Sequence, residues 1–356
     1  MDSSTQSAAP ARQYWIDILR TFACICVITI HTPLPEKYGG EPLDPACLFY
    51  LRSGASVLFF MISGALILDR PRRLIPFMKT RLLHIGVPVV IWGLLAFALN
   101  IYKYDYTSVG IVLDMVSMPF IDVVRNEYWF IYTLMGIYLM TPMLSTWLNS
   151  CSRRECEILL GAWMLTLCIP YAAIVLPQLN RVSEIDGMLY YFTGYAGYAV
   201  LGFYLRRYVS VTKITPAMVT AVLLIVSVTW PLSEYVPSVH TVLLSRTNIC
   251  TALMASTYFL LIKSISVSER TGKIFYNFAN HSFGIYLTHH FVISELLWPQ
   301  TIRLALHPAV SIPVTAIITI IISYMTVSAL SRLPLSRYTV SYTAPERKFR
   351  FRLSLK

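Results

Sequence analysis

The chain has 356 residues, of which 56% are hydrophobic and only 13% are charged. About a quarter of the residues of a soluble domain are charged, so this composition excludes an ordinary soluble enzyme. The net charge of +11 would suggest nucleic-acid binding in another chain. Here the basic residues lie mostly in short segments between apolar stretches, as in cytoplasmic loops beside anionic lipid. We therefore expect a protein of the lipid bilayer that binds no nucleic acid.

Apolar stretches long enough to cross a bilayer recur along the chain. About 20 apolar residues are needed, because the hydrocarbon layer is roughly 30 Å thick and a helix rises about 1.5 Å per residue. A shorter apolar stretch at 109–121 is interpreted as interfacial or re-entrant. We expect about ten transmembrane helices, at residues 15–34, 48–68, 82–101, 128–148, 158–177, 189–206, 214–231, 247–266, 281–299 and 309–331.

The segments between these helices predict the orientation. Of the 29 lysine and arginine residues, 21 fall in one set of alternate segments and six in the other. Cytoplasmic loops are enriched in these residues, so both termini are expected in the cytoplasm. The predicted fold is an all-α integral membrane bundle, with a cytoplasmic tail at 1–14, one transmembrane domain at 15–331 and a basic cytoplasmic tail at 332–356.

The first predicted helix contains three ionisable residues, Asp17, Arg20 and His31. Charges at membrane depth are costly and occur mainly where they line a cavity or meet a partner. Asp17 and Arg20 are three positions apart and share a helix face. Eleven positions separate Arg20 from His31, about three turns plus roughly 20°, so both point the same way about 16 Å apart along the axis. The structural alternative is an Asp17–Arg20 pair at the membrane edge and a histidine that caps the helix.

This arginine–histidine spacing in a first helix resembles the signature of the membrane-bound acyltransferase-3 family. Further family motifs follow in order along most of the chain. They are Leu58-Phe-Phe-Met-Ile-Ser-Gly64, Tyr128-Trp-Phe-Ile131, Gly202-Phe-Tyr-Leu205 and Ser282-Phe-Gly-Ile-Tyr-Leu-Thr-His289. The resemblance implies ten helices with both termini inside. It also implies transfer of an acyl group, usually acetyl, from cytoplasmic acyl-CoA to a hydroxyl, often on an envelope glycan.

For that reaction, His31 is the predicted general base, which removes the proton of the acceptor hydroxyl as its oxygen attacks the thioester. Histidine suits this role because its unperturbed pKa is about 6.5. Arg20 is expected toward the donor side, with Asp17 as its partner. Direct transfer and an acyl-His31 intermediate both stay open. Acetyl-CoA enters as the donor substrate, and no permanently bound cofactor or metal is expected, because the histidines lack Cys, Asp or Glu at ligand spacing.

A cluster of arginines follows the second predicted helix. Guanidinium groups form forked, charge-assisted hydrogen bonds with phosphate, and acyltransferase-3 members have a comparable arginine-rich loop. The alternative is an ordinary positive-inside cluster. The predicted donor-binding residues are Arg70, Arg72 and Arg73, with Arg81 and Lys79 as additions to the same patch.

Several polar and aromatic residues are expected near the outer side of the bundle. Glu127 is a candidate for orienting His31 or binding sugar hydroxyls, and Trp129 for stacking on a sugar. Interfacial aromatics are also ordinary membrane anchors, and His289 has an equally good explanation as a structural hydrogen-bonding group between helices. The predicted acceptor or cavity residues are Glu127, Tyr128, Trp129, Arg52, Tyr286 and His289.

The resulting expectation is a multi-pass O-acyltransferase, in particular an O-acetyltransferase, of the bacterial inner membrane. Its expected partners are acyl-CoA, the bilayer, and an envelope glycan or polyprenyl-linked sugar acceptor. The acceptor's identity and the oligomeric state stay open. The main alternative is a secondary transporter or flippase of a lipid-linked glycan, which is disfavoured by the lack of inverted repeats and by the Arg20–His31 spacing. A non-catalytic membrane scaffold would leave the ionisable residues of the first helix unexplained.

Overall fold

The computed structural model describes residues 13–32, 45–103, 108–117, 128–211, 216–297 and 307–341. Within these residues the chain is almost entirely helical and contains no strand, as the all-α prediction requires. The first half forms α1 (Tyr14–His31), α2 (Pro45–Ile67), α3 (Leu74–Arg81), η2 (Leu82–Gly86), α4 (Val87–Lys103), α5 (Ser108–Ser117), α6 (Trp129–Ser150) and α7 (Arg153–Val175).

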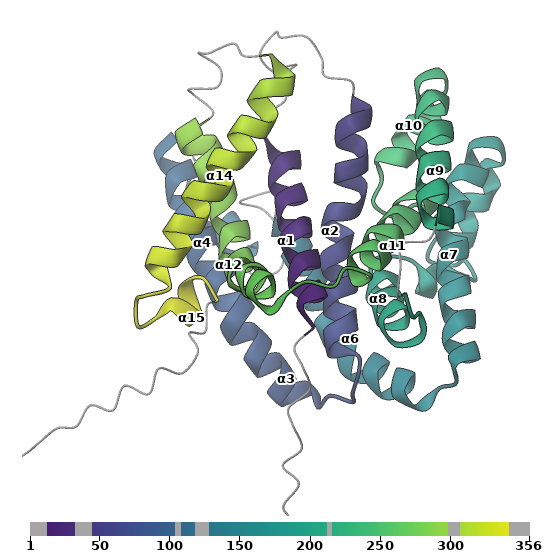
Figure 1. The fold of residues 1–356 in the computed structure, drawn as a ribbon, viewed down its shortest axis with the longest axis horizontal. Helices are drawn as coiled ribbons and strands as arrows, with labels where there is room; N and C mark the ends of the chain where they lie inside the picture. Colours follow the sequence, from purple (N-terminus) through teal and green to yellow (C-terminus); the bar gives the residue numbers. More distant parts are fainter. Residues whose placement is uncertain are drawn as a thin grey trace, which may run out of the picture.

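The second half continues as a helical bundle around the same centre. Its elements are η4 (Pro177–Ser183), η5 (Tyr190–Phe192), α8 (Ala196–Tyr208), α9 (Pro216–Tyr235), α10 (Pro237–Leu244), α11 (Ile249–Lys263), α12 (Glu269–Phe291), η6 (Val292–Leu297), α14 (Pro308–Leu330) and α15 (Ser336–Thr339). α1 packs against α2, α12, α11 and α14. It therefore occupies the middle of the bundle, beside α2 (Figure 1).

A helix occupies each of the ten predicted positions, but their lengths differ. In the described part of the chain, four helices are long and apolar enough to cross a membrane: Tyr14–His31, Leu74–Tyr102, Arg153–Val175 and Val310–Leu330. α8 has only 13 residues, which is about 20 Å of helix and shorter than the hydrocarbon layer. A total of about ten crossings and a cytoplasmic location of both termini stay predictions.

The third predicted span starts earlier than expected, because α3, η2 and α4 form one continuous helix. η2 is a π-helical turn, and it ends two residues before Pro88. Pro88 has no backbone N–H to donate to the carbonyl of His84. A π turn accommodates such a missing bond, and π turns are frequent at functional sites.

α12 also begins earlier than expected, at Glu269 rather than near residue 281. The Ser268 side chain caps the helix by accepting a hydrogen bond from the backbone N–H of Thr271. Glu269 lies in the first turn, where a carboxylate stabilises a helix N-terminus, and pairs with Lys273 at 2.7 Å. Hydropathy alone misses this start because the first half of α12 is polar.

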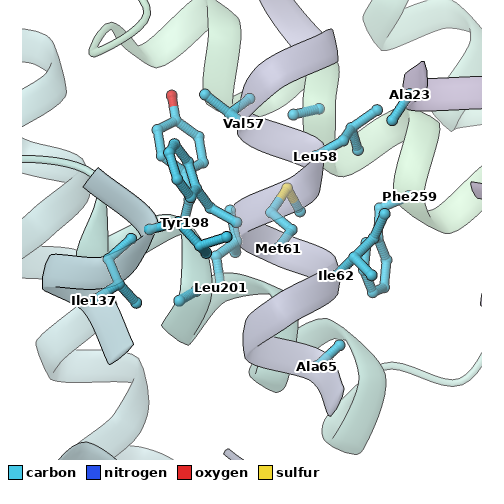
Figure 2. Packing of buried hydrophobic residues seen from close by; sticks show 14 of the residues in the cluster. Ala23, Val57, Leu58, Met61, Ile62, Ala65, Ile137, Tyr198, Leu201 and Phe259 are labelled. Atoms are coloured by element: carbon cyan, nitrogen blue, oxygen red, sulfur yellow. The ribbon is translucent and has the colours of Figure 1, made fainter. Parts of the chain in front are cut away.

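The α2–α8 contact forms the tightest part of the core. Figure 2 shows Met61 of α2 beside Tyr198 and Leu201 of α8. A Cβ atom added to Gly64 would lie 1.8 Å from the carbonyl oxygen of Ala199, and one added to Gly202 would lie 2.0 Å from that of Met61. Glycine is therefore required at both positions for the two backbones to approach.

Candidate functional site

A cavity of about 330 Å³ lies inside the bundle, between α1, α2, η2, α6 and α12. Its volume is within the range of about 300–1,000 Å³ that is typical of ligand pockets. The polar side chains on its wall include two arginines, one from α1 and one from the end of α3. The lining residues are Arg20, Phe59, Ser63, Arg81, His84, Ile85, Phe130, Leu134, Tyr138, Tyr276, Ala279, Asn280, Ser282, Phe283, Tyr286 and Ser341. We call this space the arginine cavity.

A second, much smaller cavity of about 20 Å³ adjoins His31. We call it the histidine cavity. Its lining residues are Val27, Ile30, His31, Ser56, Phe59, Trp129, Phe130, Arg246 and Tyr286. Phe59, Phe130 and Tyr286 line both cavities, and neighbouring ring centroids in this group are 5.8 and 5.7 Å apart. The two spaces therefore adjoin and share three aromatic side chains.

α1 presents Arg20 and His31 to this pair of cavities, whereas Asp17 lines neither. Arg20 lines the arginine cavity and His31 lines the histidine cavity, as expected for two residues on one helix face. Asp17 is buried, with 3% of its surface exposed. Its backbone carbonyl accepts a hydrogen bond from the Thr21 hydroxyl. α1 thus connects a cationic space at one end with a titratable imidazole at the other.

His31 is joined to His289 of α12 by a hydrogen bond. Nδ1 of His31 lies 2.9 Å from Nε2 of His289, and Nδ1 of His289 lies 2.5 Å from the backbone carbonyl oxygen of Tyr286. A carbonyl oxygen only accepts, so Nδ1 of His289 donates its proton to it. In the neutral ring, Nε2 of His289 is then the acceptor, and Nδ1 of His31 donates to it. The lone pair of His31 is therefore on Nε2.

This arrangement can orient a general base. The Tyr286 carbonyl selects the tautomer of His289, and His289 selects the tautomer of His31. His289 is 1% exposed, so water does not compete for its hydrogen bonds. His290 lies nearby, with ring centroids 6.5 Å from His31 and 6.3 Å from His289. In the part of the chain that the structure describes, no group of three His, Cys, Asp or Glu residues forms a metal site.

Replacing His289 tests this orienting role. We expect His289→Ala to lower the kcat of the expected acyl transfer about 100-fold, because His31 loses the acceptor that selects its tautomer. His289→Gln should recover part of the rate, since its amide oxygen can accept from Nδ1 of His31. The pH dependence of kcat should also shift in both variants, which loss of packing alone would not cause. The orienting role would be contradicted if His289→Ala and His289→Gln had the same kcat as each other and the same pH profile as the wild type.

The predicted donor-binding arginines occupy different environments. Arg81 lines the arginine cavity and stacks on Phe77 and Tyr138, with its guanidinium carbon 5.1 and 5.2 Å from the ring centroids. Its buried Nε has no hydrogen-bond partner among the described residues. Arg70 and Arg73 are exposed and lie outside the cavity lining.

Arg72 is held by its own chain. Its Nε donates to the carbonyl oxygen of Ile67 at 3.2 Å, and a terminal nitrogen lies 3.6 Å from Asp69. Partial burial lowers the pKa of Arg72 from its ordinary value, and the charges of Arg70 and Arg81 lower it further, while Asp69 opposes them. Arg70, Arg72 and Arg81 are therefore close enough to interact electrostatically.

Among the predicted acceptor residues, Trp129 and Tyr286 line the histidine cavity. The guanidinium of Arg246 lies over the Trp129 ring, 4.6 Å from its centroid, so one ring face is already covered. Tyr128 is buried. Glu127 and the side chain of Arg52 lie outside the described residues.

The structure adds cavity residues that the sequence analysis did not single out. On α12, Tyr276, Ala279, Asn280 and Phe283 precede Tyr286 at helical spacing, so one face of that helix lines the arginine cavity. This periodicity can be recognised in the sequence once Ser268 is taken as the residue that caps the start of α12. Ser56 and Arg246 of the histidine cavity had no comparable signal. In the sequence, Arg246 is only one of the six basic residues in the less basic set of segments.

Long apolar helices that enclose a polar, two-part cavity define an integral membrane protein with an internal site. The acyltransferase-3 profile, described as an acyltransferase domain, matches residues 13–328. The chain therefore belongs to the acyltransferase-3 family of membrane acyltransferases. No curated protein and no solved structure matches the chain significantly.

Proposed function

We propose that the protein transfers an acyl group, in particular acetyl, from cytoplasmic acyl-CoA to a hydroxyl of an envelope polysaccharide or its lipid-linked precursor. The observation that supports this most directly is the position of His31. It lies in a small cavity that adjoins a cationic one, and its Nδ1 hydrogen bond to His289 leaves the lone pair on Nε2. A base next to a space for a phosphate-bearing donor is what acyl transfer from CoA requires.

In the proposed reaction, the acceptor oxygen forms a bond with the thioester carbonyl carbon, and Nε2 of His31 takes the acceptor's proton. The carbonyl electron pair moves onto its oxygen. When the intermediate collapses, the C–S bond breaks, and the imidazolium returns its proton to the leaving thiolate. The products are the O-acyl ester and CoA. Direct attack is the simpler scheme, and an acyl-His31 intermediate is distinguished from it by ping-pong kinetics.

The acceptor side of the proposal rests on resemblance. The first-helix residues Tyr14 to Arg20 and the Ile30-His31-Thr32 sequence resemble those of a bacterial O-acetyltransferase of enterobacterial common antigen. A lipid-linked or envelope glycan acceptor and a location in the bacterial inner membrane are proposed on this basis. Comparing O-acetylation of the envelope glycans with and without this protein would identify the acceptor.

Radiolabelled acetyl-CoA tests the proposed activity with the purified chain in detergent. A transferase should move label to an added glycan acceptor or hydrolyse the thioester slowly with water. A secondary transporter or flippase should do neither. The proposal would be rejected if folded and monodisperse protein released no CoA from acetyl-CoA under any condition.

Arg81 is the arginine that we expect to contribute most to donor binding. Its guanidinium is part of the cavity wall, and its unsatisfied Nε would gain a charge-assisted hydrogen bond from a CoA phosphate. Arg81→Gln should therefore raise the dissociation constant of acetyl-CoA about 10- to 100-fold. Arg70→Gln and Arg73→Gln should have smaller effects, because these exposed groups attract the donor through a screened field.

Titration of CoA binding by calorimetry measures these differences. The matched control is Arg154→Gln, an exposed arginine at the start of α7 that contacts neither cavity. Its affinity should equal that of the wild type. Unchanged affinity in Arg81→Gln would contradict the donor role of the arginine cavity.

A further inference from the structure

Two polar side chains on the wall of the histidine cavity have no role in the reaction as described so far. They are Ser56 of α2 and Arg246, which lies between α10 and α11. They come from distant parts of the sequence and face the same small space as His31. Acyl transfer places negative charge on the thioester carbonyl oxygen, and enzymes stabilise that charge with preorganised hydrogen-bond donors.

Ser56 has a donor that nothing in the described chain satisfies. Its residue is 7% exposed, and its buried Oγ has no hydrogen-bond partner among the described residues. Helical hydroxyls elsewhere in this chain bond to the carbonyl one turn earlier, as Thr21 does to Asp17 and Thr141 to Ile137. A buried polar group left without a partner is costly and rare. Its position beside the cavity indicates that a ligand atom supplies the partner.

Arg246 supplies a positive charge at the same place. Its guanidinium is held over the Trp129 ring and hydrogen bonds to the Tyr195 hydroxyl, while its other N–H donors remain at the edge of the planar group. Its backbone carbonyl accepts a hydrogen bond from Tyr198, which anchors the segment on α8. Within the described ranges, no carboxylate lies within ion-pair distance of Arg246.

The size of the cavity limits what these groups can bind. A volume of about 20 Å³ is close to that of a single water-sized probe. It accommodates one oxygen-sized group and not a sugar ring. A thioester carbonyl oxygen has this size, and it is the atom that becomes negative when the acceptor attacks.

We propose that Ser56 and Arg246 form the oxyanion site of the acyl-transfer reaction, an inference that rests on the proposed function. The Ser56 hydroxyl and an Arg246 N–H donate to the thioester carbonyl oxygen. The acceptor oxygen bonds to the carbonyl carbon, the carbonyl electron pair moves onto the oxygen between these donors, and His31 takes the acceptor's proton. When the C–S bond breaks, the carbonyl re-forms and CoA leaves as the thiol with the proton from His31.

Hydrolysis of acetyl-CoA by the purified full-length chain tests this site, because water replaces the glycan as acceptor. We expect Arg246→Gln to lower kcat about 100- to 1,000-fold and Ser56→Ala to lower it at least about 10-fold. The KM for acetyl-CoA should stay close to the wild-type value in both. Arg246→Lys should retain more activity than Arg246→Gln, since it keeps the charge.

The matched controls are Arg181→Gln and Ser150→Ala, which change exposed residues outside both cavities and should leave kcat unchanged. Thermal unfolding checks each variant, and Ser56→Ala removes only one buried oxygen. Wild-type kcat in both Arg246→Gln and Ser56→Ala overturns the inference, as does a higher KM at unchanged kcat. A wild type that neither transfers the acetyl group to an added glycan nor hydrolyses acetyl-CoA rejects the proposed function and this inference with it, whereas unaffected variants of an active wild type reject the inference alone.

Discussion

Replacing His31 by glutamine is expected to lower the rate of acyl transfer about 10²- to 10⁴-fold, the contribution of a well-positioned general base. The glutamine side chain has no group that takes a proton at neutral pH. Its amide nitrogen can still donate to Nε2 of His289, so the polar contact between α1 and α12 is kept. The expected loss is therefore one of chemistry and not of folding.

Single-turnover kinetics with radiolabelled acetyl-CoA measures the effect on the chemical step. Binding of CoA should match the wild type, because the arginine cavity does not include His31. His240→Ala on α10 is the matched control, since this histidine lies outside both cavities, and it should transfer at the wild-type rate. Turnover by His31→Gln at more than about a tenth of the wild-type rate would reject the general-base assignment.

The position of Arg20 and His31 could be predicted from sequence because it depends on local geometry. Both residues belong to one continuous helix, and the rotation per residue decides which face they share. The helix positions were likewise predictable from hydropathy. The lengths of the helices were less predictable, because α12 begins at a polar capping sequence that no hydropathy average detects.

The partners of these residues depend on tertiary packing, which the sequence does not display. His31 and His289 are 258 positions apart, and the family motif identified His289 without saying what it contacts. Nothing around Arg246 in the sequence indicates that it lies beside His31. From sequence, Arg81 is only an addition to the cluster of Arg70, Arg72 and Arg73, yet of these four arginines it alone lines the cavity. Arg81 differs because it belongs to the continuous helix formed by α3, η2 and α4, whereas Arg70, Arg72 and Arg73 precede that helix.

The second large effect is expected from the glycines between α2 and α8. Gly64→Ala and Gly202→Ala should each destabilise the fold by about 1–3 kcal/mol or more, the cost of overpacking a close contact. The added methyl groups would meet the backbone carbonyls of Ala199 and Met61. Because the obstructing atoms are backbone, no change of rotamer relieves the clash, and the helices have to separate.

Separation of these helices should also reduce activity, since α2 supplies the cavity residues Ser56, Phe59 and Ser63. Thermal unfolding in detergent and the yield of monodisperse protein measure the first effect, and acetyl-CoA turnover measures the second. Gly136→Ala and Gly161→Ala are the matched controls, because a Cβ at either position meets nothing within 4 Å.

These controls should unfold at or slightly above the wild-type temperature, since alanine favours a helix over glycine by about 1 kcal/mol. Replacing glycine by alanine is thus expected to lower the stability at Gly64 and Gly202 and to leave it unchanged or raise it at Gly136 and Gly161. Unfolding of Gly64→Ala and Gly202→Ala at the temperature of the controls would mean that α2 and α8 are not as close as described. The position of the α2 residues beside His31 would then need revision, because it depends on that contact.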